Sequence, residues 1–175
     1  MMEMVTVSWI VTLLAILALF FVPSALKAYT AAFAVLVNVL ITSWLSLPAL
    51  GGNTVEFSVF AGTFLGDILL RIDGLSAWFI IIINFTSLTG VFYGSGYLKA
   101  YNNPSSKLIL HWSLFILFHL SMVWVCMLQN GFAFLLAWEV MSLTSMLLVV
   151  FDHHKTQTTK AGINYQFQMH ISVVF

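Results

Sequence analysis

Residues 132–151 read FAFLLAWEVMSLTSMLLVVF, and this stretch decides the fold. Glu139 is its one charged residue. At a rise of about 1.5 Å per residue, a helix of this length spans about 30 Å, which is the thickness of the hydrocarbon core of a bilayer. The stretch therefore predicts a transmembrane helix with a carboxylate near its middle.

Four other stretches have the same character, and a sixth begins near Ala161. The complete stretches cover residues 5–22, 28–47, 75–94 and 108–128. The sixth covers residues 161–175, which is too short to cross a bilayer. Pro23 and Pro48 are expected to close the first two helices. The sequence predicts an all-α membrane protein with five complete transmembrane helices and an incomplete sixth.

The composition excludes several classes of protein. Hydrophobic residues make up 61% of the 175 residues and charged residues 7%, whereas soluble domains carry roughly 25% charge. The formal net charge is zero, so a basic surface for nucleic acid is absent from the sequence. The single cysteine, Cys126, excludes a disulfide framework. We find no motif for a phosphate loop, a nucleophile, a metal or a redox cofactor, and we expect none of these sites.

Residues 54–73, between the second and third stretches, alternate in polarity. Val55, Phe57 and Val59 alternate with polar residues, and Leu70 and Ile72 do so after a bend that contains glycine. A period of two is typical of strands, so we expect a short β-hairpin outside the membrane. An irregular loop is the alternative.

The basic residues indicate which ends of the helices face the cytoplasm. One side of the predicted membrane carries five lysines, and the other carries only Arg71 beside four acidic residues. The five are Lys27, Lys99, Lys107, Lys155 and Lys160. By the positive-inside rule the lysine side is cytoplasmic, which places the N-terminus and the hairpin outside. The N-terminus has no positive charge before its apolar run, so we expect it to remain as the first span.

Glu139 is the main candidate functional residue. An ionisable side chain at bilayer depth costs about 2.5–3.5 kcal/mol on insertion scales, so it needs a partner or a hydrated cavity. We expect Glu139 to be buried and to take up and release a proton. The alternative is a protonated carboxyl group that joins two helices by a hydrogen bond.

Two histidines and a serine accompany this acid. Helical rise places His119, His170 and Glu139 near one depth, so together they could form a proton-transfer chain. Either histidine could instead only bond a neighbouring helix. Ser142 lies three residues after Glu139, where its hydroxyl could bond the carboxyl group or, as an alternative, the helix backbone. Asn84 belongs to a polar stripe on the third span, which lines a hydrated path or a helix contact.

Two other groups of histidines are weaker candidates. His111 lies near the end of the fourth span and is expected at the membrane interface. His153 and His154 adjoin Asp152 in a loop, where a solvated turn is favoured over a metal site because further ligands are missing.

Three segments resemble a known family. They are Arg71-Ile-Asp-Gly-Leu-Ser-Ala-Trp-Phe, Leu88-Thr-Gly-Val-Phe-Tyr-Gly-Ser-Gly-Tyr and Phe134-Leu-Leu-Ala-Trp-Glu-Val-Met-Ser-Leu. In this order they resemble the antiporter-like subunits of respiratory complex I. The same superfamily includes multi-subunit sodium/proton antiporters and the membrane subunits of hydrogenase-4 and formate hydrogenlyase. Met141-Ser-Leu and Gln168-Met-His are most similar to the branch of hydrogenase-4 component B.

This resemblance implies a role in ion transport. Glu139 would correspond to the glutamate that pairs with a lysine on a later helix, and proton movement would be coupled to redox chemistry in partner membrane subunits. The chain would then be an N-terminal portion of such a subunit, in a bacterial or archaeal cytoplasmic membrane, without a redox site of its own. Two alternatives stay open: a subunit that exchanges sodium for protons, and a truncated membrane anchor without transport activity.

Overall fold

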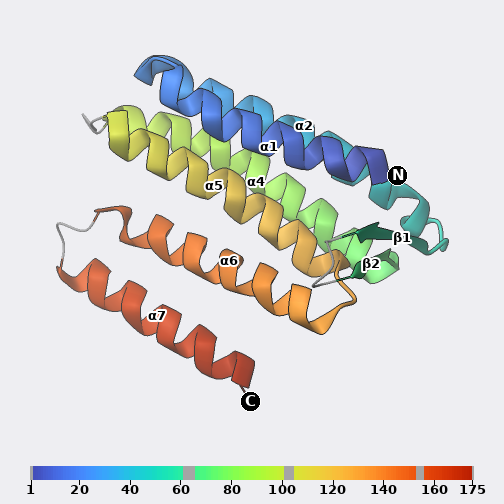
Figure 1. The fold of residues 1–175 in the computed structure, drawn as a ribbon. Helices are drawn as coiled ribbons and strands as arrows, with labels where there is room; N and C mark the ends of the chain where they lie inside the picture. Colours follow the sequence, from blue (N-terminus) through green and yellow to red (C-terminus); the bar gives the residue numbers. More distant parts are fainter. Residues whose placement is uncertain (1, 61–65, 101–104, 153–155, 175) are drawn as a thin grey trace.

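The computed structural model describes residues 2–60, 66–100, 105–152 and 156–174, and it shows a layered bundle of long helices (Figure 1). The helices are α1 (Met2–Phe21), α2 (Ser24–Leu50), α4 (Gly74–Ala100), α5 (Ser105–Met127), α6 (Gly131–Val149) and α7 (Thr156–Val174), with a short 3-10 helix, η1 (Val150–Asp152), after α6. Two strands, β1 (Val55–Phe60) and β2 (Asp67–Ile72), lie between α2 and α4. His153, His154 and Lys155 lie outside the described residues.

Five of these helices are long and apolar enough to cross a membrane, which confirms the predicted fold class. They are α1, α2, α4, α5 and α6. Most of them extend beyond the predicted stretches, and α2 continues through Pro48 to Leu50. The prediction that Pro48 closes this helix was wrong, because a proline in the last turn leaves few further helical bonds to break. The backbone N–H groups of Gly51 and Asn53 donate to the Pro48 carbonyl and end the helix there.

Helix α2 is central to the first part of the bundle, where it packs against α1, α4 and α5. Ala31, Ala34 and Val35 of α2 are completely buried. Small side chains allow such close approach of helices in a membrane, where packing replaces the hydrophobic effect as the driving force. Helix α6 packs on α5, and α7 packs on α6 as an outer layer (Figure 1).

The predicted hairpin is confirmed. Strands β1 and β2 pair in antiparallel register, with Val55 opposite Ile72 and Phe57 opposite Leu70. Val55, Leu70 and Ile72 are buried, whereas Glu56 and Arg71 face outward and form an ion pair at 3.6 Å. The alternation of apolar and polar residues therefore corresponds to an inner and an outer face.

The hairpin also holds the turn that leads into α6. The N–H of Gln129 donates to the Leu69 carbonyl at 3.1 Å, and Leu70 forms an isolated antiparallel bridge with Leu128. Asn130 then caps α6, because its side-chain oxygen accepts from the N–H of Ala133 at 3.1 Å. The start of the helix that carries Glu139 is thus fixed from two sides.

Asp73 caps the start of α4, as Asn130 caps α6. Its carboxylate accepts a hydrogen bond from the N–H of Ser76 at 2.8 Å. This bond lowers the pKa of Asp73 below its usual value, because it stabilises the charged form. The helix end next to the hairpin is therefore capped by a negative charge, as the helix dipole favours.

Candidate ion-translocation site

Glu139 and His170 form an ion pair between α6 and α7. The Oε2 atom of Glu139 lies 2.9 Å from Nε2 of His170. Glu139 is eight residues from the start of α6, which is about 12 Å along the helix and places it well inside the span. Two residues predicted to share a depth are therefore in direct contact.

The prediction that Glu139 is buried was wrong for this chain. Its side chain is 37% exposed and that of His170 is 48% exposed. The reason is that α6 is covered by α5 on one side and by α7 on another, and the remaining surface is open (Figure 1). Depth in a bilayer and burial inside the protein are separate properties, and helical rise predicts only the depth of a residue.

Gln166 lies one helical turn before His170 and contacts its second ring nitrogen, Nδ1. Nδ1 of His170 is 2.9 Å from the Gln166 backbone carbonyl and 3.1 Å from the side-chain nitrogen Nε2 of Gln166. The carbonyl can accept a hydrogen bond from a protonated Nδ1, and the amide N–H can donate a hydrogen bond to an unprotonated Nδ1. Nδ1 of His170 therefore has a hydrogen-bond partner whether the ring is a charged imidazolium or neutral. A group that gains and loses a proton needs a partner in both states.

Ser142 contributes to this interface without touching the carboxyl group. Its buried hydroxyl donates to the backbone carbonyl of Glu139 at 3.1 Å and accepts from Nε2 of Gln166 at 3.4 Å. The expected bond to the carboxyl group is absent among the described contacts, and the alternative of a bond to the helix backbone is what the structure shows. Ser142 thus links α6 to the residue that supports His170.

His119 is not part of this pair. It is completely buried, and its Nε2 lies 3.0 Å from Oδ1 of Asn84 on α4. The predicted chain of Glu139, His119 and His170 was therefore wrong in its grouping. Equal depth does not imply a shared face: α5 presents His119 to α4, whereas α6 presents Glu139 to α7.

Asn84 is the centre of a buried polar network. Its Nδ2 donates to Thr42 Oγ1 at 2.9 Å and to Ser43 Oγ at 2.8 Å, both on α2. One turn earlier on α2, Asn38 accepts from Ser8 at 2.6 Å and donates to Thr12 at 3.0 Å, both on α1. Four helices are thereby joined by side-chain hydrogen bonds in their apolar interior. Asn84 belonged to the predicted polar stripe, whereas Asn38 was missed.

Lys27 was also missed, because the sequence suggested a lysine in the connection between two spans. It lies in the first turn of α2 with only 1% of its surface exposed. Its Nζ donates to the Leu19 carbonyl at 2.9 Å, near the C-terminal end of α1. A cation at this end of a helix is favoured by the helix dipole. The sequence did hold one signal for this placement: Lys27 follows Pro23-Ser24 by three residues, and a helix that begins there has Lys27 in its first turn.

Other titratable groups form no further site among the described residues. His111 packs between the rings of Trp112 and Phe151, at centroid distances of 5.2 and 4.9 Å. No group of three histidine, cysteine, aspartate or glutamate residues that could hold a metal ion occurs in the described part of the chain.

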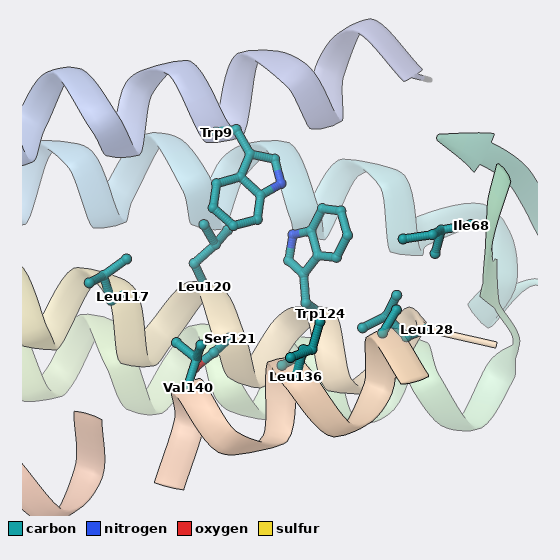
Figure 2. Close-up of a pocket in the computed structure, with 11 residues that line it drawn as sticks. Trp9, Ile68, Leu117, Leu120, Ser121, Trp124, Leu128, Leu136 and Val140 are labelled. Carbon is teal, nitrogen blue, oxygen red and sulfur yellow. The ribbon is translucent and has the colours of Figure 1, made fainter. Parts of the chain in front are cut away.

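An apolar cleft of about 390 Å³ lies between α1, α5 and α6 (Figure 2). Trp9 and Trp124 meet edge to face at its upper side, with ring centroids 5.3 Å apart, and Leu136 and Val140 of α6 close the opposite side. Ser121 is its polar lining residue. A cleft with this lining suits hydrocarbon.

The chain is similar to several known membrane proteins, although no family model matches it. It is 31% identical to hydrogenase-4 component B of Escherichia coli (strain K12) over 109 residues, which are 62% of this chain and 16% of that protein. It is 30% identical over 105 residues to a protein of Staphylococcus saprophyticus named "Putative antiporter subunit mnhA2", and 31% identical over 80 residues to its namesake in Staphylococcus aureus. These matches cover 59% and 46% of this chain.

The chain thus spans only about a sixth or less of the length of these relatives. The relatives are named as a component of a hydrogenase and as subunits of antiporters. Taken with the five helices that are long and apolar enough to cross a membrane, these similarities support the resemblance to the antiporter-like membrane subunits.

Proposed function

We propose that this chain is the proton-translocating portion of a membrane subunit in a redox-driven complex. The observation that carries the proposal is the Glu139–His170 ion pair at 2.9 Å, inside a span that has no other charged residue. A carboxylate and an imidazole in direct contact can pass a proton between them, so the pair can take part in proton transfer. Gln166 satisfies the second nitrogen of His170 in either state.

The open surface beside the pair supports a partner on that side. Glu139 and His170 are both partly exposed, so a further helix or subunit can approach the carboxylate. In the family that the sequence resembles, a lysine on a later helix takes this position. A cation there would compete with His170 for Glu139 and could drive a proton from one to the other.

The proposed orientation follows from the grouping of the connections. The hairpin, the N-terminus and the turn between α5 and α6 lie at one end of the bundle (Figure 1). Lys27 lies near the other end, in the first turn of α2. We assign the hairpin end to the outer face of a bacterial or archaeal cytoplasmic membrane.

Sodium/proton exchange is the second candidate, and the relatives named as antiporter subunits favour it. A carboxylate that is one-third exposed could bind a sodium ion in place of a proton. The two functions differ in their energy source, because pumping needs electron transfer and exchange needs only an ion gradient.

Flux in sealed inverted membrane vesicles distinguishes them. The vesicles should contain this sequence within the complete protein and its partner subunits, with a pH-sensitive dye inside. We expect the interior to acidify when hydrogen, formate or NADH is oxidised, and we expect the same rate with sodium or potassium as the salt. Proton movement that requires a sodium gradient and occurs without any electron donor would replace the proposal by the exchange function.

A further inference from the structure

We propose that His119 is a second proton-binding site, separate from the Glu139–His170 pair, and that its Nδ1 is the atom that receives the proton. Its role in transport rests on the proposed function, whereas the site itself follows from the hydrogen bonds around Asn84. His119 is completely buried, and Nδ1 has no hydrogen-bond partner among the described residues.

The orientation of the Asn84 amide is fixed by its neighbours on α2. Its Nδ2 faces three oxygens, Thr42 Oγ1 at 2.9 Å, Ser43 Oγ at 2.8 Å and the Val39 carbonyl at 3.4 Å. The carbonyl has no proton to donate, so the amide nitrogen and not the amide oxygen must face it. The hydroxyl of Thr42 has its own acceptor, the Asn38 carbonyl at 2.8 Å. Oδ1 of Asn84 therefore faces Nε2 of His119 at 3.0 Å, and Oγ1 of Thr42 lies 3.3 Å from it as well.

This orientation determines the tautomer of His119. Oδ1 of Asn84 can only accept, and it lies 3.0 Å from Nε2 of His119, so Nε2 must carry the hydrogen. In the neutral ring the other nitrogen, Nδ1, then has a free lone pair. A basic nitrogen that is buried without a partner is an uncommon arrangement, and it marks the place where a proton or a water molecule would bind.

Proton uptake at Nδ1 leaves the rest of the network intact. One proton passes from water to Nδ1, the ring gains one positive charge, and the Nε2–H bond to Asn84 is retained. That bond becomes stronger because its donor is then charged. Asn84 is already polarised by the bonds that its Nδ2 gives to Thr42 and Ser43, and such chains reinforce each other. Asn84 is thus a positioning residue for His119.

Among the described residues, the surrounding helices hold no ion-pair partner for His119. On α6, Glu139 is paired with His170. The other ionisable groups of the packed helices lie five or more residues along their helices from the network: Glu3 on α1, Lys27 and Tyr29 on α2, Tyr93 and Tyr97 on α4, and Lys107, His111 and Cys126 on α5. A proton on His119 is therefore expected to bind without the help of Glu139.

Nitrogen NMR of the complete protein in lipid bilayers, labelled with ¹⁵N-histidine, tests the site directly. The His119 signals are assigned by their loss in His119→Gln. We expect Nε2 to be protonated and Nδ1 bare at high pH, and Nδ1 to gain a proton as the pH falls while Nε2 keeps its own. A bare Nε2 at high pH, or an Nδ1 that stays bare over the whole range in which the protein is folded, would overturn the proposal.

Three variants test whether Asn84 sets the tautomer of His119 or whether any change in the buried network alters it. Asn84→Leu should convert the single tautomer into a mixture, whereas Asn84→Asp, which still accepts from Nε2–H, should keep it. Asn38→Leu removes a buried amide of the same network that does not contact His119, and it should leave the signals unchanged. A single tautomer that survives in Asn84→Leu, or one that is lost in Asn84→Asp, contradicts the role of Asn84.

Glu139→Gln provides the test of separateness. We expect the protonation of His119 to be unchanged in this variant, and a loss of protonation would show that the two sites are one. None of these measurements depends on transport. A protein that does not pump would therefore overturn the proposed function and leave this site intact. An Nδ1 atom that never gains a proton would overturn this site and leave the proposed function intact.

Discussion

Replacing Glu139 by glutamine is expected to reduce redox-driven proton pumping by at least about tenfold, because a carboxamide cannot take up or release a proton. Glutamine has nearly the shape of glutamate, and its side-chain oxygen can still accept from Nε2 of His170, which lies 2.9 Å from the present carboxylate. The contact between α6 and α7 should therefore survive. The amount of protein in the membrane should remain at the wild-type level.

Glu56→Gln is the matched control for this experiment. Glu56 is also a partly exposed carboxylate in an ion pair, with Arg71 at 3.6 Å, but it lies on the hairpin outside the spans. Exposed pairs of this kind contribute about 0–1 kcal/mol, so pumping should be unchanged. Both variants are compared as acidification rates of inverted vesicles at equal protein content. Pumping at the wild-type rate in Glu139→Gln would exclude Glu139 from the translocation path.

Replacing Gly162 by alanine should displace α7 and separate His170 from Glu139. Gly162 is buried at the contact with α6, and an added Cβ would overlap Cγ2 of Val150. Valine is stiff at its first side-chain torsion, so it yields less easily than a long side chain. Overpacking of this kind costs about 1–3 kcal/mol. We expect a lower temperature of unfolding in detergent and a loss of pumping.

Shortening the opposing side chain should reverse the effect. Val150→Ala removes the Cγ2 atom that the new Cβ would meet, so Gly162→Ala with Val150→Ala should regain most of the stability and of the pumping. Gly96→Ala serves as the control, because a Cβ at this exposed helical position meets nothing within 4 Å. Equal stability of Gly162→Ala and Gly96→Ala would contradict the tight packing of α7 on α6.

The membrane spans and the hairpin could be predicted from the sequence because each has a strong periodic or length signal. Runs of about 20 apolar residues match the bilayer, and the alternation from Val55 to Val59 matches a strand with one buried face. The helix ends were less accurate, since α2 continues past Pro48. Helix ends depend on local hydrogen bonds, such as those to the Pro48 carbonyl, which composition does not indicate.

The site could be predicted only in part, for a related reason. The helical rise predicts how deep each residue lies in the membrane, and it placed Glu139 and His170 at the same depth, where the structure shows them in contact. It gives no information on which face of a helix meets which neighbour, because a helix in lipid is apolar all round and lacks an amphipathic pattern. His119 was therefore grouped with Glu139, although it bonds Asn84 in a different layer. Asn38 owes its burial to helix packing that the sequence does not show.

Infrared difference spectroscopy of the membranes during turnover tests the central claim most directly, namely that Glu139 exchanges a proton beside His170. The predicted result is a carboxyl C=O band that changes when the electron donor is added, disappears in Glu139→Gln and shifts in His170→Gln. Glu56→Gln should leave this band unchanged. A turnover spectrum of Glu139→Gln identical to that of the wild type would show that this carboxyl group does not exchange a proton.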